Sequence, residues 1–124
     1  DNHSSPLGVA LLLDRLYTDS LLARADQDFI CSTLRQCTTG TDRIAAPLAG
    51  KPGVTIGHKT GSGYRNPDGS LAAHNDAAFI TLPDGRHYTL AVLVKDFKGS
   101  DRQASEAIAR ISSAVYAMLS EHHM

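Results

Sequence analysis

A short run of residues, GHKTGSG at 57–63, combines a cation, a hydroxyl and closely spaced glycines. A lysine ammonium (Lys59) and a threonine hydroxyl (Thr60) on one face of a strand can together bind a small carboxylate. Gly61 lets a ligand approach the main chain closely, and the N–H of Ser62 can point at an oxygen that develops negative charge. These residue types therefore predict recognition of a carboxylate beside an oxyanion site.

The same stretch partly matches a nucleotide-binding P-loop, which needs glycine, four residues and then Gly-Lys-Thr or Gly-Lys-Ser. Gly53 and Lys59 fit that spacing, but His58 occupies the position of the second glycine. A P-loop also leads from its strand directly into a helix, whereas residues 66–69 (NPDG) form a turn sequence. The sequence therefore argues against a phosphate site here.

The histidines and cysteines form no metal or disulfide pattern. His58, His74 and His87 lie on or near predicted strands, and their spacing matches no zinc-binding motif. Cys31 and Cys37 are placed in one predicted helix, with their Cα atoms roughly 9 Å apart along its axis, beyond the reach of a disulfide. We therefore expect no metal, no cofactor and two packed or free thiols.

The composition is that of one ordinary globular unit. The 124 residues are 42% hydrophobic and 20% charged, and 12 Lys and Arg against 13 Asp and Glu give a net charge of -1. No basic surplus indicates a nucleic-acid partner, and the apolar run at 9–13 is too short to span a membrane. Because the sequence opens with Asp1 and has no signal-peptide pattern, we expect a trimmed or processed piece.

Hydrophobic spacing and turn residues predict which elements position the GHKTGSG stretch at 57–63. The expected helices are residues 5–18, 26–37 and 100–120. The expected strands are residues 54–60, 77–82 and 87–95, and the expected loop is 38–53. The predicted fold class is α/β (α+β): a three-stranded antiparallel meander flanked by helices, in a single unit covering residues 1–124.

Five segments together resemble the C-terminal part of a class A serine β-lactamase, a family that carries the Lys-Thr-Gly box. They are SSPLGVALLLDRLY (4–17), TTGTDRIAAPL (38–48), GHKTGSG (57–63), AAHNDAAFITLPDGRHYTLAVLVKD (72–96) and DRQASEAIARISSAVYAML (101–119). The similarity covers essentially all of the sequence and implies the β-lactamase/transpeptidase-like fold. His58 precedes the box where many members have Asp, which resembles a subgroup that includes extended-spectrum and cephalosporin-hydrolysing enzymes.

The resemblance implies a role for each candidate. Lys59 would shape the electrostatics of the site and help to bind the substrate carboxylate, and the Thr60 hydroxyl would hydrogen-bond the same carboxylate. Gly61 would line the substrate site, and Ser62 would offer its N–H as an oxyanion donor and its C=O to the substrate amide. Arg43 would support the carboxylate site. The implied reaction is hydrolysis of the β-lactam amide of penicillins or cephalosporins through an acyl-enzyme, in the periplasm or after secretion.

Each of these candidate residues also has a purely structural interpretation. Lys59 can be a solvated lysine at a strand end, and Thr60 can be present only because threonine favours strands. Arg43 can brace a surface loop without reaching a ligand. Asn75 and Asp76 match the family's Asn-Asp pair and are interpreted as residues that brace strands by hydrogen bonds.

Other parts of the family's machinery are absent from these 124 residues. No serine is followed three residues later by lysine, Ser-Asp-Asn does not occur, and the only glutamates are Glu106 and Glu121. In the family those parts precede the segment that this chain resembles. The chain is therefore expected to supply a substrate clamp but no nucleophile; alternatively, it is a non-catalytic fragment or binding module of the same fold.

The prediction of protein partners rests on the strand expected over residues 87–95. In the family, one neighbour of this strand comes from the N-terminal segment. Residues 88–94 contain no charge, proline or glycine, and an unpaired strand of that kind is a template for another chain. We therefore expect the missing N-terminal portion, or a second copy in a homo-oligomer, to pair with it.

Overall fold

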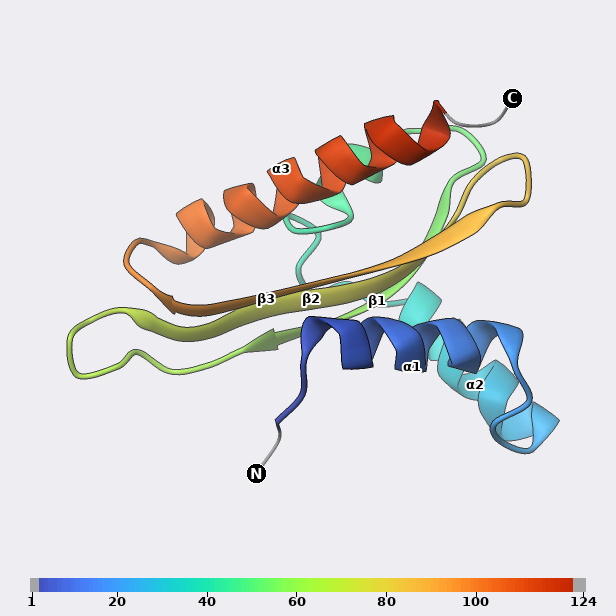
Figure 1. Ribbon diagram of the computed structural model, residues 1–124, viewed down its shortest axis with the longest axis horizontal. Coiled ribbons are helices and arrows are strands. Elements are labelled where there is room, and N and C mark those ends of the chain that lie inside the picture. Colours follow the sequence, from blue (N-terminus) through green and yellow to red (C-terminus); the bar gives the residue numbers. More distant parts are fainter. Residues whose placement is uncertain (1–2, 122–124) are drawn as a thin grey trace.

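The computed structural model describes residues 3–121 and has three layers: two helices, an antiparallel sheet and a long helix (Figure 1). The helices are α1 (Pro6–Thr18), α2 (Arg24–Arg35), the short 3-10 helix η1 (Ala46–Leu48) and α3 (Asp101–Ser120). The strands are β1 (Thr55–Ser62), β2 (Leu71–Thr81) and β3 (His87–Phe97), in the order β1-β2-β3. The predicted fold class is therefore confirmed; residues 1–2 and 122–124 of the expected unit lie outside the described part.

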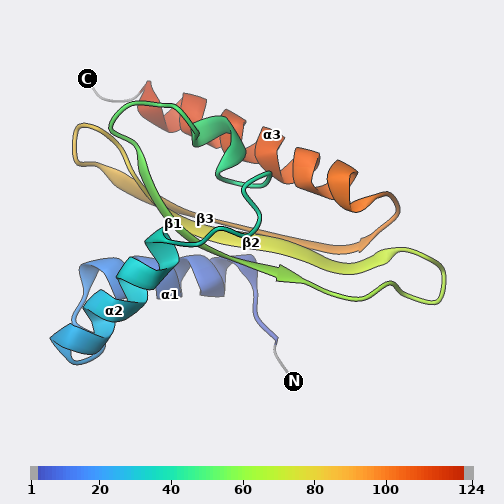
Figure 2. The same ribbon diagram turned by 180° about the vertical axis from the view of Figure 1, so that it is seen from behind.

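Helices α1 and α2 cover one face of the sheet, while α3 and η1 cover the other (Figure 2). Helix α1 begins where its sequence predicts, because Ser5 Oγ accepts a hydrogen bond from Gly8 N–H (3.0 Å) and Pro6 lies in the first turn. Helix α3 begins with a reciprocal capping box between Ser100 and Gln103. No helix within residues 3–121 is long and apolar enough to cross a membrane.

Helix α2 is displaced from the predicted range of 26–37. It begins at Arg24 without a side-chain cap, so its sequence carries no sharp start signal. At its end, Gln36 N–H donates to Ser32 O (3.2 Å), which closes the last turn before Cys37. The prediction that both cysteines lie in one helix is therefore wrong, although both thiols are free as expected.

Strand β2 differs most from its predicted range, since it starts at Leu71 and not at residue 77. Its first six residues, LAAHND, include few of the β-branched and aromatic types that favour strands. Pairing with both neighbours makes this segment a strand: Ser62 lies opposite His74, and His74 lies opposite Val94. The hairpin before it closes through Asn66 N–H and Ser70 O (2.8 Å).

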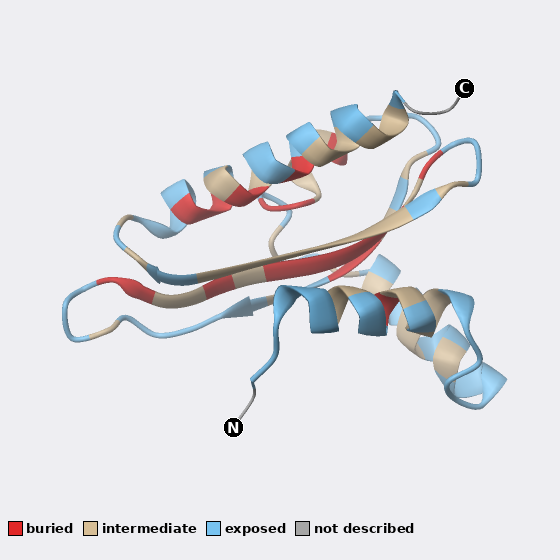
Figure 3. Ribbon diagram, viewed as in Figure 1, coloured by how far each residue is buried: buried red, intermediate tan, exposed pale blue. Residues whose placement is uncertain are grey.

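The hydrophobic core lies between the sheet and α3 (Figure 3). Its fully enclosed members are Ile44, Leu48, Ala78, Ile80 and Ile108. Two of them come from the loop after α2, so that loop is part of the core and not a loose connection. The loop therefore has a fixed position relative to β1.

The opposite face of the sheet is covered less completely. Tyr17 of α1 stacks on Phe79 of β2 with ring centroids 4.1 Å apart. Leu7, Leu11 and Leu12 on the outer side of α1 are each more than half exposed. A continuous apolar strip on a helix normally packs against another element, so this layer lacks a cover within residues 3–121.

Candidate functional site

Strand β1 carries the candidate box along one edge of the sheet. Lys59, Thr60, Gly61 and Ser62 occupy its last four positions, and β2 pairs with it on one side only. Within residues 3–121 no strand lies on the other side. The main chain of the box is therefore accessible to an extended ligand.

Main-chain groups alternate in direction along this edge. Gly63 N–H donates to Ala73 O (2.8 Å), so the polar groups of Gly63 face β2. Thr60 O instead faces outward, because it accepts a hydrogen bond from Lys59 Nζ (2.6 Å). With the two-residue period of an antiparallel edge, the N–H and C=O of Ser62 point outward as those of Thr60 do.

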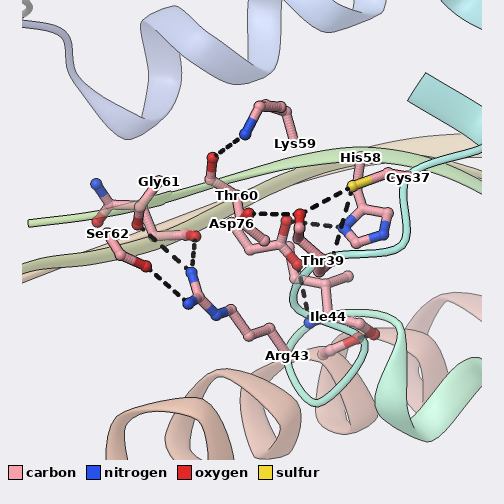
Figure 4. Close-up of polar contacts among 12 residues, drawn as sticks. Cys37, Thr39, Arg43, Ile44, His58, Lys59, Thr60, Gly61, Ser62 and Asp76 are labelled. Atoms are coloured by element: carbon pink, nitrogen blue, oxygen red, sulfur yellow. Dashed lines mark hydrogen bonds and ion pairs between the residues drawn. The ribbon is translucent and has the colours of Figure 1, made fainter. Parts of the chain in front are cut away.

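Lys59 and Thr60 lie on opposite faces of β1 (Figure 4), so the expectation that they share one face is wrong. Successive side chains of a strand alternate between its faces. Lys59 is exposed and points toward α1, whereas Thr60 Oγ1 lies 2.9 Å from Thr39 Oγ1 in the loop after α2. A carboxylate can contact both residues only at the open edge of the strand.

Arg43 reaches β1 from the face opposite Lys59 (Figure 4). Its Nη1 donates to Asn75 O (2.7 Å) and more weakly to Gly61 O (3.4 Å), and its Nη2 donates to Ser62 Oγ (2.9 Å). Arg43 is 8% exposed. The structure thus brings Arg43, Gly61 and Ser62 together, which the sequence left undecided.

The loop can deliver Arg43 because Gly40 adopts a left-handed backbone conformation with φ of 62°. A side chain at this position would collide with Thr60 Cγ2. Glycine is therefore required both by the backbone angle and by the close approach of the loop to the box. This requirement explains the glycine of the Thr38-Thr39-Gly40 run.

The charge of Arg43 is not neutralised by an acidic side chain. Its partners are two carbonyl oxygens and one hydroxyl, it forms no salt bridge within residues 3–121, and its Nε is buried without a partner. Buried charges are normally paired, because an isolated ion in a protein interior is costly. The site therefore has an uncompensated positive charge beneath the edge of β1.

The pKa of the neighbouring His74 is lowered in this environment. Burial of its ring lowers the pKa of His74 below its usual value, and the nearby Arg43 guanidinium lowers it further. Its Nε2 lies 2.8 Å from Ser105 Oγ on α3, so the ring is held by a neutral partner. Burial first, and the Arg43 charge second, therefore disfavour protonation of this ring.

Three polar contacts that the sequence did not predict lie in and around the box. Thr39 Oγ1 lies between Thr60 Oγ1 (2.9 Å) and Cys37 Sγ (3.4 Å). His58 Nδ1 lies 3.0 Å from Asp76 Oδ1, and this pair is almost fully buried. Strand alternation could have placed His58 and Thr60 on one face, but their partners are distant in sequence and needed the fold.

The interpretation of Asn75 and Asp76 as braces agrees with their contacts. Asn75 Oδ1 accepts a hydrogen bond from Val94 N–H of β3 (3.0 Å), and Asp76 Oδ2 accepts one from Ile44 N–H (3.1 Å). Asp76 therefore joins β2 to the Arg43 loop and not only to a neighbouring strand. No cluster of metal-binding side chains occurs within residues 3–121.

Comparisons with known proteins agree with this geometry. The model of the beta-lactamase enzyme family matches residues 1–119. A beta-lactamase of Phocaeicola vulgatus is 58% identical over 95% of the chain, and the extended-spectrum beta-lactamase PER-1 of Pseudomonas aeruginosa is 34% identical over 93% of the chain. A class A beta-lactamase structure from Bacteroides cellulosilyticus superposes with a TM-score of 0.86, at 36% identity over 94% of the chain.

The matched relatives are much longer than this chain. The chain spans 37% of the Phocaeicola vulgatus relative, 36% of PER-1 and 41% of the Bacteroides cellulosilyticus protein. The sequence match, the sheet with its flanking helices and the position of the box on an edge strand all lead to the same assignment. The chain belongs to the beta-lactamase enzyme family and has the fold of part of a class A enzyme.

Proposed function

We propose that this chain supplies the substrate-carboxylate clamp and one oxyanion donor of a serine β-lactamase. The whole enzyme would hydrolyse the β-lactam amide of penicillins or cephalosporins through an acyl-enzyme, and the nucleophilic serine would come from outside these 124 residues. The observation that carries the proposal is the buried, uncompensated guanidinium of Arg43 beneath the open edge of β1. A positive charge at this position favours the binding of an anion.

Each box residue has a place in this proposal. A substrate carboxylate at the edge of β1 would be contacted by Lys59 from the α1 side and by the Thr60 hydroxyl, with Arg43 supplying positive charge from beneath. The outward N–H of Ser62 would donate to the oxyanion that forms when the lactam carbonyl is attacked. Gly61 would leave room for the substrate against the strand.

The test uses a chimaera in which residues 1–124 replace the matched segment of the Phocaeicola vulgatus relative. The chimaera should hydrolyse a chromogenic cephalosporin, and the 124-residue chain alone should show no turnover above background. An acyl-enzyme found by mass spectrometry on a serine of the isolated chain would contradict the assignment of the nucleophile. A folded chimaera that retains the relative's nucleophile but shows no hydrolysis would contradict the proposed clamp.

The alternative is a non-catalytic fragment or binding module, and the absence of Ser-x-x-Lys from the sequence favours it for the isolated chain. Its partner would be the N-terminal portion of the same enzyme, or a second copy pairing through residues 87–95. Residues 88–94 of β3 are all half-buried and have no strand beyond them within residues 3–121. The periplasm or the cell exterior is the proposed location of the whole enzyme, where it would confer resistance to β-lactam antibiotics.

A further inference from the structure

We propose that Asp76 and Ser112 are positioning residues for Arg43, because together they hold the main chain of the next residue, Ile44. This inference rests on the proposed carboxylate clamp and adds two residues to it. Asp76 belongs to β2 and Ser112 to α3, so the Arg43 loop is fixed between the sheet and the long helix. Both side chains are fully buried.

Asp76 holds the N–H of Ile44. Its Oδ2 accepts that hydrogen bond at 3.1 Å, and its Oδ1 lies 3.0 Å from His58 Nδ1. Each carboxylate oxygen therefore has a separate hydrogen-bond partner, and the plane of the carboxylate is fixed. Both partners of this contact are buried, so losing it would leave a polar group without a partner, and the contact anchors the loop on β2.

Ser112 holds the C=O of the same residue. Its Oγ donates to Ile44 O at 2.7 Å. Serine is an unusual choice for the core-facing side of a helix unless its hydroxyl is bonded. Because both polar main-chain groups of Ile44 are engaged by buried side chains, the direction in which the Arg43 side chain leaves the loop is defined.

The guanidinium itself is held less firmly than the loop that carries it. Its partners are neutral, one of its three hydrogen bonds is 3.4 Å long, and its Nε has no partner. The position of the charge therefore depends on the main chain at residues 43 and 44. A displacement of about 1 Å in a site of this kind can cost about 100-fold in rate.

Ser112→Ala in the chimaera tests this inference, and Ser105→Ala is the matched control. Both serines are buried on α3, but Ser105 bonds to His74 and not to the Arg43 loop. We compare kcat/KM for a penicillin with that for its methyl ester, which lacks the charged carboxylate. Ser112→Ala should lower kcat/KM for the acid about tenfold, the equivalent of one hydrogen bond, mainly through KM. It should change the ester much less.

A double-mutant cycle with Arg43→Ala identifies the route of the effect. If Ser112 acts through Arg43, Ser112→Ala has no further effect on the acid once Arg43 is absent. Equal losses for acid and ester, or additive losses in the cycle, overturn the positioning role. If Arg43→Ala itself fails to discriminate acid from ester, the proposed clamp is wrong, which is a different outcome.

A second measurement does not depend on turnover. The amide of Ile44 and the Nε–H of Arg43 can be followed by NMR in the chimaera carrying either serine substitution. Ser112→Ala should speed hydrogen exchange at Ile44 and shift the Arg43 signal, whereas Ser105→Ala should leave the Ile44 exchange rate unchanged. Unchanged signals in Ser112→Ala overturn the proposal even if the chimaera is inactive.

Discussion

The two edges of the sheet are built in opposite ways. The β1 edge is polar and supported from within the chain: Arg43 contacts it from beneath, Thr39 bonds Thr60, and Lys59 bonds an outward carbonyl. The β3 edge is apolar, and no strand pairs with it within residues 3–121. Its half-buried residues 88–94 pack on the helices by their faces while the edge itself stays open.

The polar β1 edge and the apolar β3 edge are therefore suited to different kinds of binding. A polar edge with an uncompensated guanidinium beneath it suits recognition of a small anion, and the chain completes that arrangement with its own residues. An uncovered apolar edge suits pairing with another strand. Since the chain spans less than half of its relatives, the apolar edge and the exposed leucines of α1 are the places where more protein is expected to pack.

The largest predicted effect concerns the polar edge. Lys59→Ala in the chimaera should lower kcat/KM by roughly 10- to 100-fold, since a charge-assisted contact is worth about 1.5–3 kcal/mol. Thr60→Ser keeps the hydroxyl and should cost much less. Steady-state kinetics on a penicillin decide the matter; a Lys59→Ala variant with nearly unchanged kcat/KM would mean that Lys59 is only a solvated strand-end residue.

The second prediction concerns the apolar edge. The isolated chain should associate with itself as its concentration rises, and Thr89→Lys should weaken this association because a lysine on an edge strand discourages pairing. Thr55→Lys, at the exposed start of β1, is the matched control and should have no effect. Sedimentation velocity measures both, and a monodisperse monomer at high concentration would rule out self-association through β3.

The third prediction tests how tightly the loop is fixed to the polar edge. Gly40→Ala should lower the free energy of unfolding by about 2–3 kcal/mol, because it adds a collision with Thr60 to the strain of a positive φ. Gly50→Ala shares the positive φ but meets no atom within 4 Å, so its cost should be only about 1 kcal/mol. Urea unfolding of the chimaera carrying each substitution gives the difference; equal costs would show that the collision is relieved.

The smallest predicted effect is a pH dependence beside Arg43. Burial, followed by the charge of Arg43, lowers the pKa of His74 below its ordinary value of 6.5. The unfolded chain therefore binds more protons than the folded chain just below pH 6.5, so the free energy of unfolding should fall as the pH decreases through that range. His74→Gln should remove this component; a variant with the same pH profile would exclude His74 as its source.

The sequence alone determined the elements whose signals are local. Ser5 and Pro6 mark the start of α1, Ser100 or Asp101 marks the start of α3, and His58 at a glycine position argues against a P-loop. These contacts lie within a few residues of one another, so residue type and spacing are enough to predict them. The resemblance of the box to its family identified the candidate residues, but not their geometry.

Only the tertiary structure decided how the candidates meet. Arg43 contacts Ser62 because a glycine turn and a buried main chain place it against the face of β1 opposite Lys59, and Asp76 bonds Ile44 although 32 positions separate them. Lys59 and Thr60 are adjacent in sequence yet lie on opposite faces of β1, because side chains of a strand alternate. Long-range pairing also made LAAHND a strand despite its weak preference. Sequence spacing specifies neighbours along the chain, whereas the direction of a side chain and its distant partners depend on packing.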